Sequence, residues 1–328
     1  MTAPTRTRIG ASELEIAPLA LGGNVFGWTA DRDESFAVLD GFVAGGGDFI
    51  DTADGYSHWV PGHGGGESEA IIGEWLRARG SRGSRADVTI ATKVSTHPDH
   101  LGLAADTVRA AVDESLERLG LDEIDLYYAH FDDADTPLEE TVAVFSELVD
   151  AGKIRAIGVS NYTAERVEEW FRIARAGGHH LPVALQPHYS LVERGFETNG
   201  LRAVAEREEL AVFPYYSLAR GFLAGKYRDA ADASAAGASP RAPEAVKYLA
   251  GSGRAVLAEL DRVAEAHGVE LATVSLAWLR RQPTVAAPIA SARTVGQLPA
   301  LLAALALDLA PEELVALSAV SAPAAAAG

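Results

Sequence analysis

The chain of 328 residues contains no cysteine, one methionine and only four lysines among its 28 cationic side chains. Without thiols it has no disulfide framework, no thiolate zinc or iron–sulfur site and no cysteine nucleophile. No apolar run approaches membrane-spanning length, and the first residues lack the apolar stretch of a signal peptide. We therefore expect a cytoplasmic protein that does not enter a membrane.

Positive charge is also scarce, since 46 acidic residues outnumber the 28 basic ones and leave a net charge of −18. A surface that binds nucleic acid or anionic lipid needs clustered cations, so we expect neither as a partner. The acid excess indicates a well-solvated surface. With 48% apolar residues the chain has enough material for a large folded core.

Short apolar runs alternate with segments of helical spacing along most of the chain. This alternation is typical of a parallel sheet with crossover helices, and eight strands favour a closed barrel. We predict an α/β fold, a (β/α)8 TIM barrel that forms one domain over residues 1–320. The expected strands are 16–21, 49–53, 88–94, 124–131, 154–160, 183–189, 210–217 and 285–290.

Other segments interrupt this alternation. TRIGASELEI, residues 7–16, predicts an N-terminal hairpin that plugs the bottom of the barrel. The Ala/Gly/Pro-rich stretch 227–245 after the seventh strand predicts a long flexible loop over one face, and residues 321–328 a disordered tail. Several helical segments end in a glycine that we expect to be the C-cap, namely Gly80, Gly120, Gly152 and Gly177.

Polar residues that end the expected strands are the candidates for chemistry, because barrel active sites lie at the carboxyl ends of the strands. Lys93 lies in an otherwise apolar strand, and a buried ammonium needs a counter-charge, which Asp51 at the end of the neighbouring strand can supply. Tyr56 follows on the next loop, and we expect the ammonium to lower the pKa of its phenol toward that of a working general acid. Without Tyr56, a structural ion pair would explain Lys93 and Asp51.

His130 ends the strand that follows Lys93, where a neutral imidazole could donate to a substrate carbonyl oxygen. A lone histidine after an apolar strand is more often structural, but its place beside the lysine strand favours catalysis. We predict no metal site, since nothing near the remaining histidines completes a ligand set.

The chain resembles the aldo-keto reductase superfamily, including the branch of the potassium-channel β subunits. The resemblance rests on FIDTADGYS, GESEAIIGEWL, ATKV, YYAH, GVSNY, LQPHYSL and GFLAGKY, which occur in the family's order and spacing over nearly the whole chain. It implies a barrel that binds NADPH without a Rossmann domain. It further implies that Tyr56 donates a proton, that Lys93 and Asp51 tune it, and that His130 orients the carbonyl.

The resemblance also implies a cofactor site. The usual aromatic-Ser-Pro-Leu-Ala-x-Gly motif is altered here: Tyr215 takes the stacking position and Tyr216 that of the serine, for which Ser217 could substitute. Ala300 and Leu301 replace the usual adenine-contacting Glu and Asn. The cofactor residues implied are Gly23, Asn24, Ser160, Asn161, Gln186, Tyr215, Tyr216, Ser217, Leu218, Ala219, Gly221, Lys226, Ser291, Arg293 and Gln297.

At the adenosine end, Thr294 and Gln297 have capping-box spacing, which predicts a helix that starts directly after Arg293. A helix N-terminus beside an arginine suits a 2′-phosphate and favours NADPH over NADH. A capped helix with a solvated arginine that binds no phosphate would give the same sequence pattern. Trp28 and Trp59 are expected to line a substrate pocket for aryl or apolar aldehydes.

We therefore predict an NADP-dependent oxidoreductase that reduces an aldehyde or ketone, a small-molecule carbonyl, to an alcohol with Tyr56 as proton donor. A keto-sugar substrate and the reverse reaction fit equally well. A nicotinamide-binding redox sensor, or an isomerase or hydrolase that uses Asp51 and His130, are the alternatives. The sequence gives no indication of oligomeric state.

Overall fold

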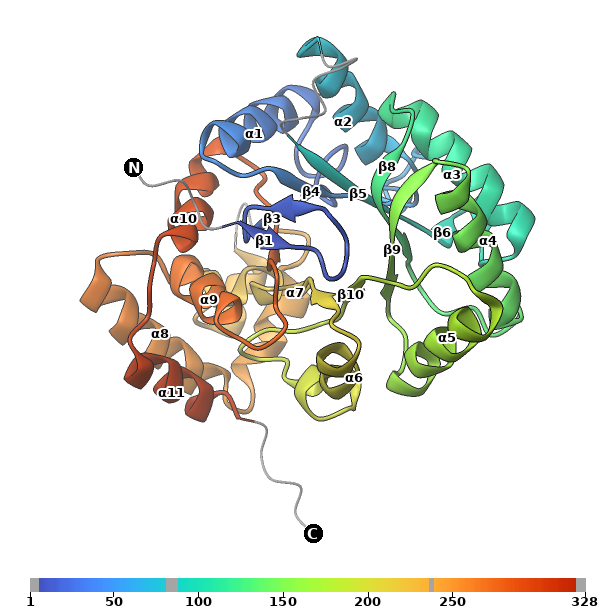
Figure 1. Ribbon diagram of the computed structural model, residues 1–328. Coiled ribbons are helices and arrows are strands. Elements are labelled where there is room, and N and C mark those ends of the chain that lie inside the picture. The colour runs from blue at the N-terminus through green and yellow to red at the C-terminus, as the bar shows by residue number, and fades with distance from the viewer. Residues whose placement is uncertain (1–5, 81–87, 236–238, 323–328) are drawn as a thin grey trace.

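The computed structural model describes residues 6–80, 88–235 and 239–322, and its centre is a curled parallel sheet surrounded by helices (Figure 1). The strand order is β11-β10-β9-β8-β5-β4-β3-β12. The strands are β3 Ala20–Gly22, β4 Phe49–Asp51, β5 Thr89–Val94, β8 Ile124–Ala129, β9 Ile154–Ser160, β10 Ala184–Gln186, β11 Ala211–Val212 and β12 Ile289–Ala290. Two small antiparallel hairpins pair β1 Thr7–Arg8 with β2 Glu15–Ile16 and β6 Thr96–His97 with β7 His100–Leu101.

The two edges of this sheet meet, which closes the barrel. Val212 of β11 forms a parallel bridge with Val285, ahead of β12. The Val212 N–H donates to the carbonyl of Thr284, and the Ala286 N–H donates to the carbonyl of Val212, both at 2.9 Å. The predicted (β/α)8 barrel is therefore confirmed. The first barrel strand starts later than predicted, because Ile16 pairs with Thr7 in the hairpin instead.

The interior of the barrel is filled by a few large side chains among many alanines. The rings of Phe49 and Phe213 meet edge to face with centroids 5.1 Å apart. Ile9, Leu14 and Ile16 of the N-terminal hairpin belong to the same buried cluster. Gly10 in the hairpin turn has φ +51°, and a Cβ there would lie 2.3 Å from the carbonyl oxygen of Val183, just before β10. The predicted hairpin thus closes the amino-terminal end of the strands, so the opposite end carries the opening.

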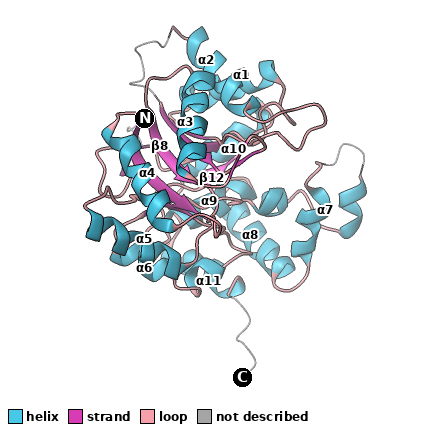
Figure 2. Cartoon of the chain, turned by 90° about the vertical axis from the view of Figure 1, so that its right-hand side faces the viewer, coloured by secondary structure: helices cyan, strands magenta, loops and turns pink. Residues whose placement is uncertain are grey.

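Helices cover the outside of the barrel, as the view in Figure 2 also shows. Gly120 and Gly178 are left-handed C-caps, whereas Gly80 and Gly152 each lie one residue beyond the cap. The cap expected at Gly177 is thus one residue later. The helices are α1 Arg32–Ala44, α2 Glu67–Ala78, α3 Ala105–Leu119, α4 Leu138–Asp150, α5 Ala164–Gly177, α6 Leu201–Arg207, α7 Ala242–Ala245, α8 Gly253–His267, α9 Leu271–Arg280, α10 Leu298–Leu302 and α11 Pro311–Val320.

The described parts of the stretch 227–245, residues 227–235 and 239–245, differ from the structureless loop that its composition predicts, and residues 236–238 lie outside the described residues. Ala230–Ser234 forms a 3-10 turn with a capping box at Asp229, and α7 follows with Ala242 and Ala245 fully buried. α7 stands to one side of the barrel in Figure 2. The small buried residues Ala242 and Ala245 therefore let α7 pack closely against the 3-10 segment Ala219–Ala224 that follows β11.

At the C-terminus, Ser321 is buried and its hydroxyl accepts a hydrogen bond from Arg194. Residues 323–328 of the expected tail lie outside the described residues. In the described ranges of the chain, no helix is long and apolar enough to cross a membrane.

Candidate active site

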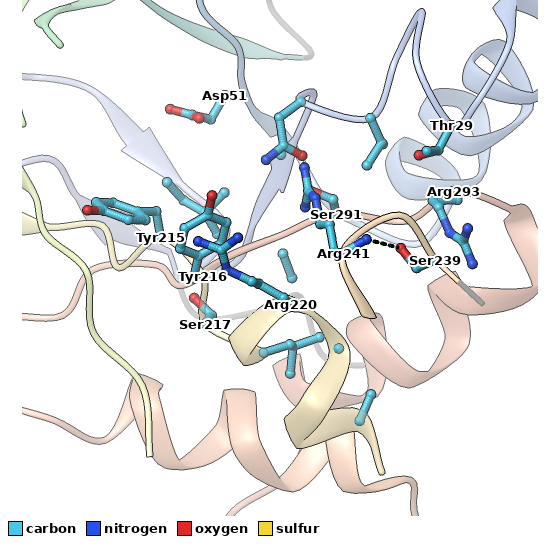
Figure 3. Close-up of a pocket in the computed structure, with 18 of the residues that line it drawn as sticks. Thr29, Asp51, Tyr215, Tyr216, Ser217, Arg220, Ser239, Arg241, Ser291 and Arg293 are labelled. Carbon is cyan, nitrogen blue, oxygen red and sulfur yellow. Dashed lines mark hydrogen bonds between the residues drawn. The ribbon is translucent and has the colours of Figure 1, made fainter. Parts of the chain in front are cut away.

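A cavity of about 900 Å³ opens at the carboxyl ends of the barrel strands. We call it the pocket. Its lining comes from the ends of β3, β4, β9, β10 and β12 and from the segments that follow them. Figure 3 shows part of this lining, with Arg220, Arg241, Ser291 and Arg293 among the side chains around it. Large concave sites at this end of a barrel are where ligands bind.

Lys93, Asp51 and Tyr56 lie together, as the sequence predicts. Lys93 Nζ is 2.6 Å from Asp51 Oδ2 and 3.1 Å from the Tyr56 hydroxyl oxygen. It also donates to the carbonyl of Thr52 at 2.6 Å, so all three of its protons have partners. The Lys93 side chain is fully buried and that of Asp51 is 3% exposed. The charged pair is therefore largely shielded from water, and Asp51 and Tyr56 both line the pocket.

The electrostatics of this group differ from expectation at Tyr56. Burial lowers the pKa of Lys93, but the adjacent Asp51 and Tyr56 outweigh it and hold that pKa above its usual value. Burial raises the pKa of Tyr56, and the ammonium of Lys93 opposes this only in part. The prediction of a lowered phenol pKa is thus wrong. Tyr56 stays protonated at neutral pH, as a proton donor must, beside a fixed positive charge.

His130 lines the same pocket, and its ring centroid is 6.0 Å from that of Tyr56. Burial, together with the nearby charge of Lys93, lowers the pKa of His130 well below its usual value. Its Nδ1 faces Thr96 Oγ1 at 3.5 Å, which leaves Nε2 for a ligand in the pocket. The imidazole is therefore neutral at physiological pH, as the sequence interpretation requires.

Deeper along β9 and β10, polar side chains form one connected set. Gln186 Nε2 donates to Asp51 Oδ1 at 2.8 Å, and Ser160 Oγ donates to the carbonyl of Gln186 at 2.9 Å. The Tyr215 hydroxyl donates to Asn161 Oδ1 at 2.8 Å, while Asn161 Nδ2 donates to the carbonyl of His130 at 2.9 Å. These contacts fix the amide groups next to the catalytic candidates, and Tyr215 is further held by the stacked ring of His188.

The segment after β11 turns sharply beside the pocket. Tyr216, Ala219, Arg220 and Gly221 all have φ between +46° and +96°, and the N–H groups of Ala219 and Gly221 donate to the carbonyls of Tyr216 and Leu218 within the turn. Ser217 is buried, and its hydroxyl donates to the carbonyl of Pro214 at 2.8 Å. Ser217 therefore has its donor engaged within the turn, which weakens the idea that it replaces the family's serine.

Four cations line the pocket, and none has a carboxylate within 4.0 Å in the part of the chain that the structure describes. They are Arg220, Lys226, Arg241 and Arg293. Burial and the charge of Arg293 lower the pKa of Lys226, and burial also lowers that of Arg241. Arg220 and Arg241 lie over the rings of Tyr216 and Trp28, at 4.4 and 4.9 Å from the centroids. Asp51, Glu244 and Glu270 also line the pocket, so its four cations outnumber its carboxylates by one, in a chain whose net charge is −18.

The segment after β12 is arranged differently from the predicted capping box. The Thr294 side chain makes no cap, and Val295–Gln297 is a 3-10 turn ahead of the five-residue α10. Gln297 Oε1 instead accepts the N–H of Arg293 at 2.7 Å. Ser291 Oγ donates to Asn24 Oδ1 at 2.9 Å, which ties this segment to the end of β3. Gln297 therefore shapes the backbone at Arg293 rather than a helix start.

Most of the residues predicted for cofactor binding lie on the pocket wall; Gly23 and Ala219 are the exceptions, because they are packed behind it. Gly23 donates its N–H to the carbonyl of Asp51 at 2.7 Å. Sequence reasoning did not single out Arg220 and Arg241. Arg220 is the variable residue of its motif, and Arg241 lies in a low-complexity stretch with Glu244 three residues further on, so no feature of the sequence pattern pointed to either of them as a pocket cation.

Aromatic side chains form the outer wall. Trp28 and Trp59 meet edge to face with centroids 5.5 Å apart, and Tyr56 and Trp59 are 6.2 Å apart. Trp59 is 43% exposed and Phe131 is 46% exposed, which is unusual for such large apolar groups. Among residues 6–80, 88–235 and 239–322, no group of three or more His, Asp or Glu side chains is placed to hold a metal ion.

Comparison with known proteins agrees with this geometry. The family model described as Aldo/keto reductase family matches residues 18–322. The chain is 34% identical to Protein tas of Escherichia coli, over 95% of this chain and 96% of that protein. It is 33% identical both to the aldo-keto reductase YhdN of Bacillus subtilis, over 90% and 85% of the two chains, and to the norsolorinic acid reductase stcV of Emericella nidulans, over 92% and 77%. The chain belongs to the aldo/keto reductase family of oxidoreductases.

Proposed function

We propose that this protein reduces an aldehyde or ketone to an alcohol with NADPH, and that Tyr56 donates the proton. The observation that carries the proposal is the Tyr56 hydroxyl at the pocket wall, 3.1 Å from a fully buried ammonium that Asp51 holds in place. A core ion pair alone would not need a phenol at the boundary between the buried charge and a ligand cavity.

The pocket fits a dinucleotide with phosphate groups. NADPH carries two charges on its diphosphate and roughly 1.5 to 2 on its 2′-phosphate, and the pocket is lined by four cations that have no carboxylate within 4.0 Å among the described residues. Arg293 and Lys226 would hold phosphate groups toward the adenosine end, with Arg220 and Arg241 across the cavity. Backbone N–H donors from the turn 216–221 would come from residues other than Ala219 and Gly221, whose N–H groups donate within the turn. The 2′-phosphate of NADPH supplies the additional negative charge that lets all four pocket cations have a phosphate partner. NADH lacks this phosphate, so the four cations favour NADPH.

At the other end, the polar set of β9 and β10 would hold the nicotinamide. The donors and acceptors that are not used within this polar set are available to a carboxamide, and they belong to Ser160, Asn161 and Gln186. Tyr215 offers a flat ring that Asn161 and His188 hold in place. Bound there, the nicotinamide supplies the hydride. Orientation of this ring decides which of its faces is presented to the substrate.

The protein's own part in the reaction is to bind, polarise and protonate the carbonyl. His130 is neutral, so Nε2–H can donate to the carbonyl oxygen without a charge of its own. Tyr56 donates the second hydrogen bond and transfers its proton as charge develops on that oxygen. Lys93 stabilises the resulting phenolate, and Asp51 keeps Lys93 charged and in position.

The aromatic outer wall favours aryl or apolar carbonyl compounds. Trp28 and Trp59 are in edge-to-face contact, and the Trp59 ring centroid is 6.2 Å from that of Tyr56. Such a wall offers few hydrogen bonds to sugar hydroxyls, so we propose aryl aldehydes ahead of keto-sugars.

The proposal is tested by following oxidation of NADPH and NADH with a panel of aryl aldehydes, short aliphatic aldehydes, ketones and keto-sugars. We expect turnover with NADPH, a higher KM for NADH and the highest kcat/KM for aryl aldehydes. Tight binding of NADPH without turnover of any carbonyl would contradict the proposal and favour a sensor.

A further inference from the structure

Asp54 is fully buried two residues before Tyr56, and the roles proposed above leave it unused. Its carboxyl group accepts the backbone N–H groups of Gly55 and Ser95, and its Oδ1 is 3.5 Å from Thr96 Oγ1. Oδ2 is buried with no hydrogen-bond partner among the described residues. A buried carboxylate oxygen without a donor is costly, so the surroundings favour the protonated acid.

Thr96 connects this carboxyl group to His130. Its hydroxyl oxygen is 3.5 Å from Asp54 Oδ1 and also 3.5 Å from His130 Nδ1. Both contacts are at the long end of hydrogen bonding, a range in which catalytic contacts tighten when a ligand binds. A threonine hydroxyl has a single proton, so it donates to only one of these two neighbours at a time.

The protonation state of Asp54 decides whether the Thr96 hydroxyl donates to Asp54 or to His130. When Asp54 is protonated on Oδ1, the oxygen that faces Thr96, it donates to the Thr96 oxygen, the Thr96 hydroxyl donates to His130 Nδ1, and the imidazole proton is on Nε2. When Asp54 is ionised, Thr96 donates to the carboxylate and accepts from His130 Nδ1–H. Nε2 then presents a lone pair to the pocket and cannot donate to a carbonyl oxygen.

The charges around Asp54 place this exchange near neutral pH. Burial, and then the carboxylate of Glu69 on α2, raise the pKa of Asp54 to about 7, while the two backbone donors and Arg118 on α3 oppose the shift. The Tyr127 hydroxyl of β8 also faces this region, and burial raises its pKa so far that it stays neutral. Since the pKa of His130 is lowered well below its usual value, the imidazole itself does not become charged in this range.

We infer that Asp54, acting through the Thr96 hydroxyl, determines which nitrogen of His130 carries the proton and is thereby a positioning residue for carbonyl reduction. The inference rests on the proposed function for its catalytic consequence, but the choice of tautomer is a property of the protein alone. Reduction requires the proton on Nε2, which the neutral acid enforces.

The first test needs neither cofactor nor substrate. Ring ¹⁵N spectra of the full-length protein, with the His130 signal assigned by difference from His130→Gln, report the tautomer directly. We expect the proton on Nε2 at about pH 6 and on Nδ1 at about pH 8.5, across the Asp54 pKa of about 7. Asp54→Asn keeps an amide donor toward Thr96 and should hold the proton on Nε2 at both pH values. A wild-type tautomer that does not change with pH would overturn the inference.

The second test is the pH profile of reduction. Wild-type kcat/KM should fall by about tenfold or more as pH rises through this range, because complete loss of one donor to the reacting oxygen costs roughly 10²–10³. Asp54→Asn should remove this fall, Thr96→Ser should preserve it, and Thr96→Val should remove it while lowering the plateau. An Asp54→Asn profile that falls as the wild type does would contradict the inference. Absence of turnover in every variant, with the tautomer change intact, would contradict only the proposed function.

Discussion

The most informative perturbation of the buried charges is Asp51→Asn. The substitution keeps the shape of the side chain but leaves the ammonium of Lys93, fully buried and 2.6 Å away, without a counter-charge. The asparagine also cannot accept from both Lys93 and Gln186, because one end of its amide is a donor. Removing one partner of a buried ion pair costs about 3–5 kcal/mol. With an unfolding entropy of about 2.1 cal/mol/K per residue, this lowers Tm by roughly 4–7 °C.

The loss should depend on pH in a defined direction. In the variant, burial without Asp51 lowers the pKa of Lys93 in the folded state below its unfolded value of about 10.4. The unfolded chain then binds more protons than the folded one, so stability rises with pH. The deficit relative to wild type is therefore largest near neutral pH and shrinks toward pH 10. Thermal unfolding at about pH 7 and about pH 9.5 measures the difference.

Asp125→Asn is the matched control. The Asp125 carboxylate is 3% exposed and 2.9 Å from Arg155, but that arginine is 43% exposed and water can solvate it after the change. We expect a smaller loss in Tm and unchanged reductase activity, whereas Asp51→Asn should also lose most activity. Equal losses of Tm in both variants, or a loss of stability in Asp51→Asn that does not vary with pH, would refute the reasoning.

Two further predictions concern the ligands. Arg293→Gln removes a pocket cation that has no carboxylate partner among the described residues. It should raise the Kd for NADPH about tenfold or more with little effect on the Kd for NADH, since a charge-assisted hydrogen bond contributes roughly 1.5–3 kcal/mol. Fluorescence titration measures both Kd values, and equal weakening of both would show that Arg293 does not contact the 2′-phosphate. Trp59→Ala removes a ring that is 43% exposed at the outer wall, and it should raise the KM for aryl aldehydes several-fold while the KM for short aliphatic aldehydes is unchanged. Val315→Ala, at a site 68% exposed on α11, is the control. Equal effects of Trp59→Ala on both substrate classes would contradict the proposed aromatic wall.

The sequence was sufficient for the barrel and for the grouping of Asp51, Tyr56, Lys93 and His130. Each ends or follows a strand, and parallel strands in a barrel bring such positions to one rim. The order of the strands then makes β4, β5 and β8 neighbours. A scarce lysine in an apolar strand was the strongest local indication, because burial of an ammonium requires a nearby anion.

Other features depend on distances that sequence patterns do not contain. The direction in which the pKa of Tyr56 shifts follows from the balance between burial of the phenol and the ammonium of Lys93 at 3.1 Å. Gln297 has capping-box spacing from Thr294, yet its side chain accepts from Arg293 because the backbone turns as a 3-10 helix there. Arg241 lines the pocket just before α7, which the buried Ala242 and Ala245 pack against the 3-10 segment Ala219–Ala224.

The most direct test of the central claim is Tyr56→Phe, measured as kcat with a reactive aryl aldehyde alongside the Kd for NADPH. Phenylalanine keeps the ring against Trp59 and His130 and removes only the hydroxyl 3.1 Å from Lys93. We predict that kcat falls by about 10²–10⁴, the range for loss of a general acid, while NADPH binds nearly as in the wild type. Turnover within a few-fold of the wild type would contradict the assignment of Tyr56 as proton donor.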